Sequence, residues 1–196
     1  MKEFSFTSFL TSNLNVEEND ITALTEDCNR RVYKKDELLF QPGMVCSHTF
    51  FVEKGLLRQY SIDPAGKEHI LQFAPENWFV SDRESVYFNQ PSQYFIQALE
   101  ETQVVLIDEE FIRVLEKKIP AFRDFNNLLL HNQIRHLQNR INLLLSALAE
   151  DRYLTFVKMY PDVLLRVPQK MVASYLGITP EGLSRVRKEL ARKNKQ

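Results

Sequence analysis

Between residues 38 and 107, hydrophobic positions occur in short runs that are rich in β-branched and aromatic side chains and are separated by turn residues. Such runs predict antiparallel β-strands. Asp63-Pro64-Ala65-Gly66 suits a hairpin turn, because proline fixes φ and glycine accepts unusual backbone angles. After a helical lead-in through Leu24, about seven or eight such strands indicate a small barrel or jelly roll. The runs are Leu38–Phe40, Thr49–Val52, Leu56–Ile62, His69–Phe73, Trp78–Val80, Tyr94–Leu99 and Val104–Ile107.

From Asp108 onward the hydrophobic spacing becomes helical. Between Pro120 and Asp151, six apolar positions follow one another at alternating steps of four and three residues, which is a heptad seam. This regular spacing favours a symmetric helix pair, and therefore a homodimer, over a single helix lying on the β domain. The seam consists of Leu130, Ile134, Leu137, Ile141, Leu144 and Leu148. Four leucines off the seam are candidates to face the β domain: Leu128, Leu129, Leu143 and Leu145.

The segment from Val167 to Lys193 predicts two helices joined by a short turn. Pro168 suits the start of the first helix, and Gly177 can adopt the left-handed conformation that ends it. Thr179 then offers a side-chain oxygen as the N-cap of a second helix. Pro180 suits the first helical position, and Glu181 complements the positive end of the helix dipole.

The second helix has two contrasting faces. Its apolar positions would pack inward, and the small Ala173 lets the two helices cross closely. The opposite face carries Glu181, Ser184, Arg185 and Lys188, whose chemistry suits the DNA major groove: arginine can bond guanine bidentately and glutamate can accept from cytosine. Three further basic residues are placed for phosphate contact or solvent: Arg187, Arg192 and Lys193. The alternative is an ordinary two-helix hairpin with a charged exterior. The inward positions are Leu183, Val186 and Leu190.

Charge is distributed unevenly over the 196 residues. The net charge is −1, but residues 152–196 carry ten Lys or Arg and three Asp or Glu, a net charge of +7, which leaves −8 for residues 1–151. A basic segment after an acidic body favours a local polyanion-binding surface over a merely solvated tail. The sequence shows neither a secretory signal nor a membrane-spanning run, so we expect a cytoplasmic protein with no membrane partner.

The motifs together resemble the CRP/FNR-type bacterial regulators. The run Val167-Pro168-Gln169-Lys170-Met171-Val172-Ala173-Ser174-Tyr175-Leu176-Gly177-Ile178-Thr179-Pro180-Glu181-Gly182-Leu183-Ser184-Arg185-Val186-Arg187-Lys188 is similar to that family's helix-turn-helix. Gly43, then Phe50-Phe51-Val52-Glu53-Lys54-Gly55, and then Gly66-Lys67-Glu68, are similar to the opening strands and hairpin of its cyclic-nucleotide-binding-like jelly roll.

This resemblance implies an α+β fold with three parts: a jelly-roll sensor domain over residues 1–119, a dimerisation helix over 120–150, and a winged-helix-like helix-turn-helix domain over 151–196. It implies a DNA-binding transcription regulator whose Glu181 and Arg185 read bases, as a homodimer on a two-fold-related duplex site, with RNA polymerase as a further partner. We include Gln169, Thr179, Ser184 and Lys188 among the expected DNA contacts. Many relatives continue into a short β wing, whereas this sequence ends at Gln196, so we expect DNA affinity to depend more on the helix.

The resemblance also implies where a cyclic nucleotide would bind. Family members that bind one have a Gly-Glu pair for the ribose and an Arg with Ser or Thr for the cyclic phosphate, whereas the matching places here are Ser81-Asp82 and Tyr94-Phe95. A phosphate beside Tyr94 and Phe95 would lack a cationic partner, and burying an unpaired anion is costly. Arg83 is the candidate substitute, although it can equally pair with Asp82 or lie at the surface. We therefore do not expect cyclic AMP to be a ligand, and the sequence does not identify another effector.

Metal, haem and enzyme functions have weaker support in the sequence. Cys28 and Cys46 are too few and too far apart for an iron–sulfur cluster or a four-ligand zinc site, so we expect neither a cofactor nor a metal. The histidines that a haem would need lie in no recognisable motif; they are His48, His69, His131 and His136. A metal-dependent cupin enzyme would need a second histidine at the position of Phe50, even though Glu53 is suitably spaced. We expect no enzyme, and the main alternative is a ligand-binding or protein-binding regulatory dimer that no longer reads DNA.

Overall fold

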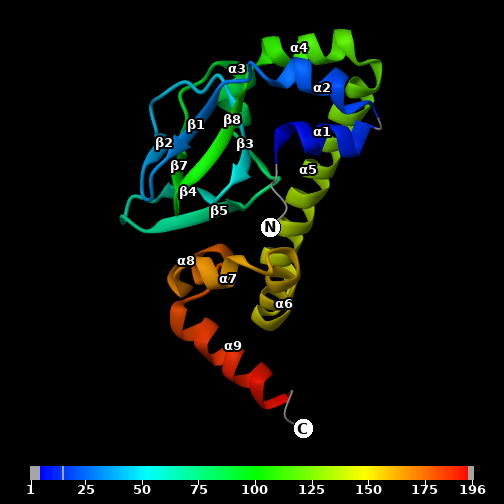
Figure 1. Ribbon diagram of the computed structural model, residues 1–196. Coiled ribbons are helices and arrows are strands. Elements are labelled where there is room, and N and C mark those ends of the chain that lie inside the picture. Colours follow the sequence, from blue (N-terminus) through cyan, green and yellow to red (C-terminus); the bar gives the residue numbers. More distant parts are fainter. Residues whose placement is uncertain (1–4, 15, 194–196) are drawn as a thin grey trace. The chain divides into compact units, whose positions relative to one another are not determined.

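The computed structural model describes residues 5–14 and 16–193, and in it the chain forms two compact units. Of the described residues, the first unit contains those up to Ile62 together with Leu71–Leu129, and the second contains Asp63–Ile70 together with those from Leu130 to Lys193. We call them the β unit and the helical unit. In chain order (Figure 1) the elements are α1 (Phe6–Leu14), α2 (Glu18–Thr25), β1 (Arg30–Tyr33), β2 (Leu38–Phe40), β3 (Thr49–Lys54), β4 (Leu57–Ile62), β5 (Glu68–Ala74), β6 (Phe79–Val80), α3 (Arg83–Phe88), β7 (Phe95–Ala98), β8 (Thr102–Ile107), α4 (Glu109–Lys118), α5 (Pro120–Ser146), α6 (Ala149–Met159), α7 (Val163–Arg166), α8 (Gln169–Leu176) and α9 (Pro180–Lys193).

The strands form two four-stranded sheets, ordered β1-β8-β3-β6 and β2-β7-β4-β5. Each of the seven expected runs contributes a strand, which confirms the jelly-roll prediction. The hairpin between β4 and β5 has the expected turn, in which Gly66 adopts a φ of +80° and donates its N–H to the carbonyl of Asp63. β1 has no counterpart among the expected runs, because its two arginines leave a pattern with little hydrophobic content.

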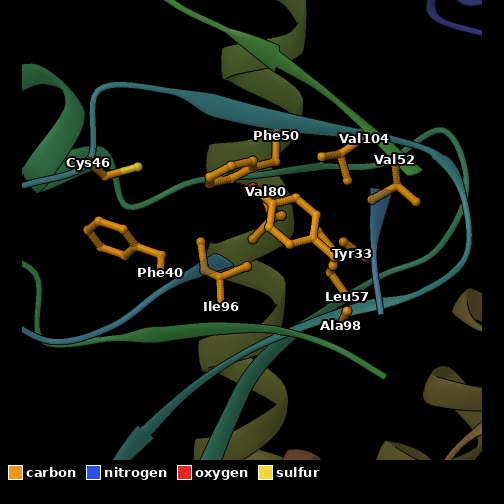
Figure 2. Packing of buried hydrophobic residues seen from close by; sticks show 11 residues of the cluster. Tyr33, Phe40, Cys46, Phe50, Val52, Leu57, Val80, Ile96, Ala98 and Val104 are labelled. Carbon is orange, nitrogen blue, oxygen red and sulfur yellow. The ribbon is translucent and has the colours of Figure 1, made fainter. Parts of the chain in front are cut away.

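Side chains from both sheets fill the interior between them. Phe50 and Val52 of one sheet point toward Ile96 and Ala98 of the other, as Figure 2 shows, and all four are buried. Because neighbouring residues of a strand face opposite sides, Phe51 points away from this interior. The buried residues of the interior are Tyr33, Phe40, Cys46, Phe50, Val52, Leu57, Ala74, Val80, Ile96, Ala98 and Val104, with the partly buried Leu39, Trp78, Val86 and Leu106 packed against them. The interior is therefore a packed hydrophobic core.

The outward faces of β3 and β8 carry a second core, which the N-terminal helices cover (Figure 1). Phe51 meets Phe6 of α1 with ring centroids 5.0 Å apart, and Phe9 lies 5.1 Å from the same ring. Leu115 of α4 is fully buried in this cluster. Packing on both sides of the sheet explains why β3 is buried from Thr49 to Glu53, without the alternation of a strand that has one face in solvent.

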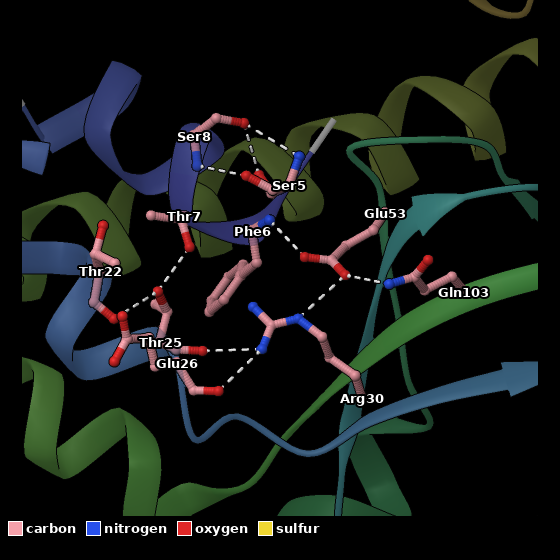
Figure 3. Close-up of polar contacts among 10 residues, drawn as sticks. All are labelled: Ser5, Phe6, Thr7, Ser8, Thr22, Thr25, Glu26, Arg30, Glu53 and Gln103. Carbon is pink, nitrogen blue, oxygen red and sulfur yellow. Dashed lines mark hydrogen bonds and ion pairs between the residues drawn. The ribbon is translucent and has the colours of Figure 1, made fainter. Parts of the chain in front are cut away.

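A buried carboxylate fixes the start of α1 (Figure 3). Glu53 accepts a hydrogen bond from the backbone N–H of Phe6 at 2.8 Å and one from Gln103 Nε2 at 3.2 Å, and it forms an ion pair of 3.3 Å with Arg30 Nε. These partners satisfy its two oxygens. Glu53 is therefore a structural residue, which argues against the cupin-like role considered for it with His48.

Candidate DNA-binding interface

The helix-turn-helix consists of α8, a short turn and α9, and its ends have the expected chemistry. Gly177 ends α8 with a φ of +65°, and its N–H is bonded to the carbonyls of Ala173 and Ser174. The Thr179 hydroxyl oxygen accepts the N–H of Gly182 at 3.1 Å, so Thr179 caps α9. Pro168 differs slightly from expectation, because it is the N-cap of α8 and the helix begins at Gln169.

The two faces of α9 separate as the sequence predicted. Leu183 and Val186 are buried, and Ala173 of α8 is buried beside them. Leu190 is half-buried. The residues expected to contact DNA are all exposed, namely Gln169, Thr179, Glu181, Ser184, Arg185 and Lys188. Lys193 instead binds Glu150, with its Nζ 2.8 Å from each carboxylate oxygen, so its charge is already paired.

Two arginines hold the C-terminus of α8. Arg140 of α5 lies over the Tyr175 ring, 3.6 Å from its centroid, and donates from Nη2 to the Tyr175 carbonyl at 3.1 Å. Arg152 of α6 donates from Nη1 to the Leu176 carbonyl at 2.8 Å. Cations at the last carbonyls of a helix also interact favourably with its dipole. These contacts fix the end of α8 immediately before the Gly177 turn that leads to α9.

The tip of the β4–β5 hairpin belongs to the same unit as α8. The Ser174 hydroxyl accepts the N–H of Ile70 at 3.0 Å and donates to the carbonyl of Glu68 at 2.8 Å. Arg140 Nη2 also donates to the Ile70 carbonyl at 3.0 Å. One side of α8 is thus hydrogen-bonded to the backbone of residues 68–70, whereas α9 retains its exposed polar face.

The heptad seam on α5 is exposed along most of its length. Leu137 retains 47% of its accessible surface and Ile141 retains 57%, while Ile134 and Leu144 are also exposed and Leu130 is half-buried. Leu148 was assigned to the same helix, but α5 ends at Ser146 and Leu148 is the extended N-cap of α6.

The four leucines off the seam are in different environments. Leu145 is 82% exposed and Leu128 is 56% exposed, so neither side chain is packed in a core. Leu143 is half-buried and lines a small cavity within the helical unit, among α5, α6 and α8. Leu129 is half-buried.

The residues at the expected nucleotide positions have structural roles. Asp82 is buried and caps α3, accepting the N–H groups of Glu84 and Ser85. Arg83 is exposed and turns toward Tyr87, with its Nη1 3.1 Å from the phenol oxygen. Arg83 therefore pairs neither with Asp82 nor with a group in the sheet interior, and Ser81 is half-buried, with its carbonyl bonded to Gln59.

Phe95 does not line the interior of the β unit. Its ring stacks on Tyr60 at a centroid distance of 4.9 Å and an interplanar angle of 12°, on the face of the sheet opposite Ile96. Tyr94 is half-buried, and Trp78 does pack against the interior core. The hydrophobic side chains of Figure 2 fill the space between the two sheets and Arg83 lies at the surface, so these residues do not assemble a site for a cyclic phosphate.

The cysteines and histidines form no assembled metal site. Across residues 5–14 and 16–193, no group of three or more His, Cys, Asp or Glu side chains is arranged to hold a metal ion. Burial raises the pKa of the Cys28 thiol to about 11, although the Arg30 charge opposes this shift. Cys46 is buried with its sulfur 3.1 Å from the His48 carbonyl, and burial raises its pKa as well. Both thiols are therefore protonated at neutral pH.

A jelly-roll domain followed by a long helix and a capped helix-turn-helix with an exposed polar face is the arrangement typical of transcription regulators. A family model described as "Cyclic nucleotide-binding domain" matches residues 30–118. Among the described residues, no helix is both long enough and apolar enough to span a membrane.

Comparison with known proteins agrees with this class. The chain is 30% identical over 179 residues to the "Transcriptional activator protein anr" of Pseudomonas aeruginosa, a match covering 85% of this chain and 72% of that protein. It is 27% identical over 168 residues to the "Anaerobic regulatory protein" of Pasteurella multocida, covering 80% of this chain and 61% of that protein. The solved structure of FixK2 from Bradyrhizobium japonicum has a similar fold, with a TM-score of 0.71 at 20% identity over 85% of this chain and 86% of that chain.

The chain belongs to the CRP/FNR family of transcription regulators. The matches span between 61% and 65% of the length of three anaerobic regulatory proteins, which is somewhat less than two thirds.

Proposed function

We propose that this protein is a homodimeric transcription regulator that reads a two-fold-related DNA site with α9. The observation that carries this proposal is the outer face of α9, where Glu181, Ser184, Arg185 and Lys188 are all exposed on a helix whose start is capped by Thr179. A helix of this kind enters the major groove with its N-terminal residues against the base edges.

The charges of this face support base and phosphate contact. Among the residues that the structure describes, neither the Arg185 nor the Lys188 side chain is engaged in an ion pair, so both remain available to DNA. Arg185 suits bidentate bonding to guanine, and Glu181 suits acceptance from cytosine. Gln169 at the start of α8 and Thr179 at the turn are the candidates for contacts beside the groove.

Dimerisation through α5 would give the site its symmetry. The exposed seam residues Leu137 and Ile141 would be buried by the same residues of a second copy, as a two-fold interface requires. Leu130, Ile134 and Leu144 extend the seam along the helix. Two recognition helices about 34 Å apart would then meet successive major grooves.

We propose further that cyclic AMP is not the effector. The interior of the β unit is occupied by Phe40, Phe50 and Tyr33, and the candidate cation Arg83 is bonded to Tyr87 at the surface. The function proposed for the chain is regulatory and not enzymatic, it acts in the cytoplasm, and RNA polymerase is the expected protein partner.

The proposal is tested by selecting bound sequences from a random duplex-DNA pool and titrating the best site with salt, with and without cyclic AMP. We expect a two-fold-symmetric consensus whose affinity falls steeply with salt, because phosphate contacts release counterions, and does not change with the nucleotide. Absence of enrichment would overturn the DNA-reading function and favour a regulatory dimer that binds another partner. A tighter complex with cyclic AMP would overturn the exclusion of that effector.

A further inference from the structure

The Ser174 hydroxyl joins α8 to the β4–β5 hairpin as both an acceptor and a donor. It accepts the N–H of Ile70 at 3.0 Å and donates to the carbonyl of Glu68 at 2.8 Å. In the part of the chain that the structure describes, β5 is the last strand of its sheet, so its outer edge has no strand beside it. Ser174 bonds this edge as a residue of a neighbouring strand would. We call these two bonds the α8–hairpin contact; they fix where α8 lies along residues 68–70.

The dimer seam on α5 lies beside the same end of α8. Arg140 of α5 donates from Nη2 to the carbonyls of both Ile70 and Tyr175, at 3.0 and 3.1 Å. Leu144 of the predicted seam lies next to the turn that follows α8, because a Cβ added at Gly177 would be 3.2 Å from the Leu144 Cδ2 atom. Within the helical unit, the seam and the turn into α9 are therefore neighbours.

The start of α9 follows this turn directly. The Gly177 N–H is bonded to the carbonyls of Ala173 and Ser174, and Thr179 caps α9 two residues later. The direction of α9 therefore depends on how α8 lies. A 14-residue helix is about 21 Å long, so a tilt of roughly 10° moves its far end by about 4 Å, close to one base-pair step. The outer face of α9 is exposed in this arrangement, so the α8–hairpin contact is compatible with DNA reading.

We infer that Ser174 is a positioning residue that sets the spacing between the two half-sites of the DNA target. The inference rests on the proposed function, in which the seams of two copies pair and each α9 reads one half-site. In such a dimer, the separation of the two α9 helices depends on the path from the seam through α8 to α9. The α8–hairpin contact holds that path in one arrangement.

The contact penalises wrong spacings and not the right one. A site whose half-sites are one base pair closer together or further apart requires α8 to shift on residues 68–70, and the shift breaks both bonds of the Ser174 hydroxyl. A site of the right spacing leaves both bonds intact in the free and in the bound protein. Removing the hydroxyl should therefore relax the spacing preference without weakening binding to the preferred site.

The test measures binding of the full chain to duplexes that carry the two selected half-sites at the selected spacing, or with one base pair more or fewer between them. Wild-type protein should prefer the selected spacing. Ser174→Ala should bind that spacing with similar affinity, and should bind the altered spacings more tightly than the wild type does by roughly fivefold or more, because two hydrogen bonds are no longer lost there. A purely structural role would lower the affinity by the same factor at every spacing.

Two further variants and one measurement without DNA locate the effect. Ser146→Ala is the matched control, since the Ser146 hydroxyl donates within α5, to the Asn142 carbonyl at 2.7 Å, and its loss should keep the wild-type spacing preference. Ser174→Thr retains a hydroxyl at the same atom position and should also keep the preference. In the free protein, amide hydrogen exchange of Ile70 should be faster in Ser174→Ala than in the wild type or in Ser146→Ala.

The outcomes separate this inference from the proposed function. An unchanged spacing preference in Ser174→Ala, or an equal loss of affinity at every spacing, would overturn the role of Ser174 and leave DNA reading intact. Unchanged exchange of the Ile70 amide in Ser174→Ala would contradict the contact itself. If no duplex is selected by the wild-type protein, the proposed function fails and the inference about spacing fails with it.

Discussion

The guanidinium of Arg140 lies 3.6 Å from the centroid of the Tyr175 ring and joins the long helix α5 to the end of α8. The same group donates to the carbonyls of Ile70 and Tyr175, so a single side chain links three segments of the helical unit. Its contribution combines a cation–π contact with charge-assisted hydrogen bonds, both of which are strengthened by partial burial.

Replacing Arg140 with methionine should loosen α8 without unfolding the β unit. Loss of the ring contact and of the two hydrogen bonds should lower the opening free energy of α8 by about 2–3 kcal/mol. Amide hydrogen exchange of residues 172–176 measures that opening. Arg135→Met, an exposed arginine on the same helix, is the matched control and should leave the exchange unchanged. Equal protection of α8 in both variants would mean that Arg140 contributes no net stability.

Charged residues in the heptad seam should dissociate the dimer. Leu137→Glu combined with Ile141→Glu removes apolar burial of about 3 kcal/mol or more, which corresponds to at least roughly a 100-fold rise in the dimer dissociation constant. Sedimentation equilibrium measures the change. Leu145→Glu replaces a leucine that is already 82% exposed and off the seam, and should leave the dimer intact. A tight dimer in the double variant would show that α5 pairs through another face.

Arg185 should determine one position of the DNA site. Arg185→Ala should weaken specific binding by about 1–3 kcal/mol and relax the preference at one base pair in each half-site. Binding to a set of single-base variants of the selected site measures both effects. Arg187→Ala, another exposed arginine of α9, should weaken binding to every sequence to a similar extent, as phosphate contacts do. A uniform loss for Arg185→Ala as well would assign Arg185 to the phosphates.

The Cys28 thiol should react slowly until the solution is strongly alkaline. Burial raises its pKa from the ordinary value of 9.0 to about 11, so the reactive thiolate is scarce at neutral pH. Because the folded-state pKa is the higher one, the buried thiol carries no ionisation penalty below pH 9.0, and the folded state loses stability relative to the unfolded state as the pH rises from 9.0 through about 11. Alkylation followed by peptide mass spectrometry gives the rate for Cys28 alone. Protein unfolded in urea should show its inflection near 9.0, and the same inflection in native protein would contradict the burial.

The helix-turn-helix was predictable because its signals are local. Gly177 specifies a left-handed backbone angle, and Thr179 specifies a helix cap. The spacing of Leu183 and Val186 specifies the buried face of α9. Each signal lies within a few residues. The interior of the β unit was less predictable. Phe95 and Ile96 are adjacent and both apolar, so these two residues alone do not reveal which of them points inward, and Gln97 gives the one signal that the Phe95 side is the outer one. Phe95 was therefore assigned to a ligand pocket although it lies on the opposite face.

Other residues escaped the sequence analysis for identifiable reasons. The family resemblance makes Asp82 a candidate to contact a ligand. An aspartate directly before a helix is also a common N-cap, because its carboxylate accepts the N–H groups two and three residues later, and α3 begins directly after Asp82. Arg140 and Ser174 gave no local signal at all. Their partners lie far along the chain, 35 residues away for Arg140 with Tyr175 and 106 residues away for Ser174 with Glu68, so only the folded chain brings them together.

The compact helical unit is not a continuous stretch of sequence, since it includes Asp63–Ile70 from the hairpin between β4 and β5. A gene fragment that starts at Leu130 would encode α6 to α9 but not the eight residues that complete their packing. In such a fragment the Ser174 hydroxyl would lose both of its partners, and Arg140 would lose one of its two acceptors. Domain dissection of this regulator therefore requires an internal graft of the hairpin and not a simple truncation.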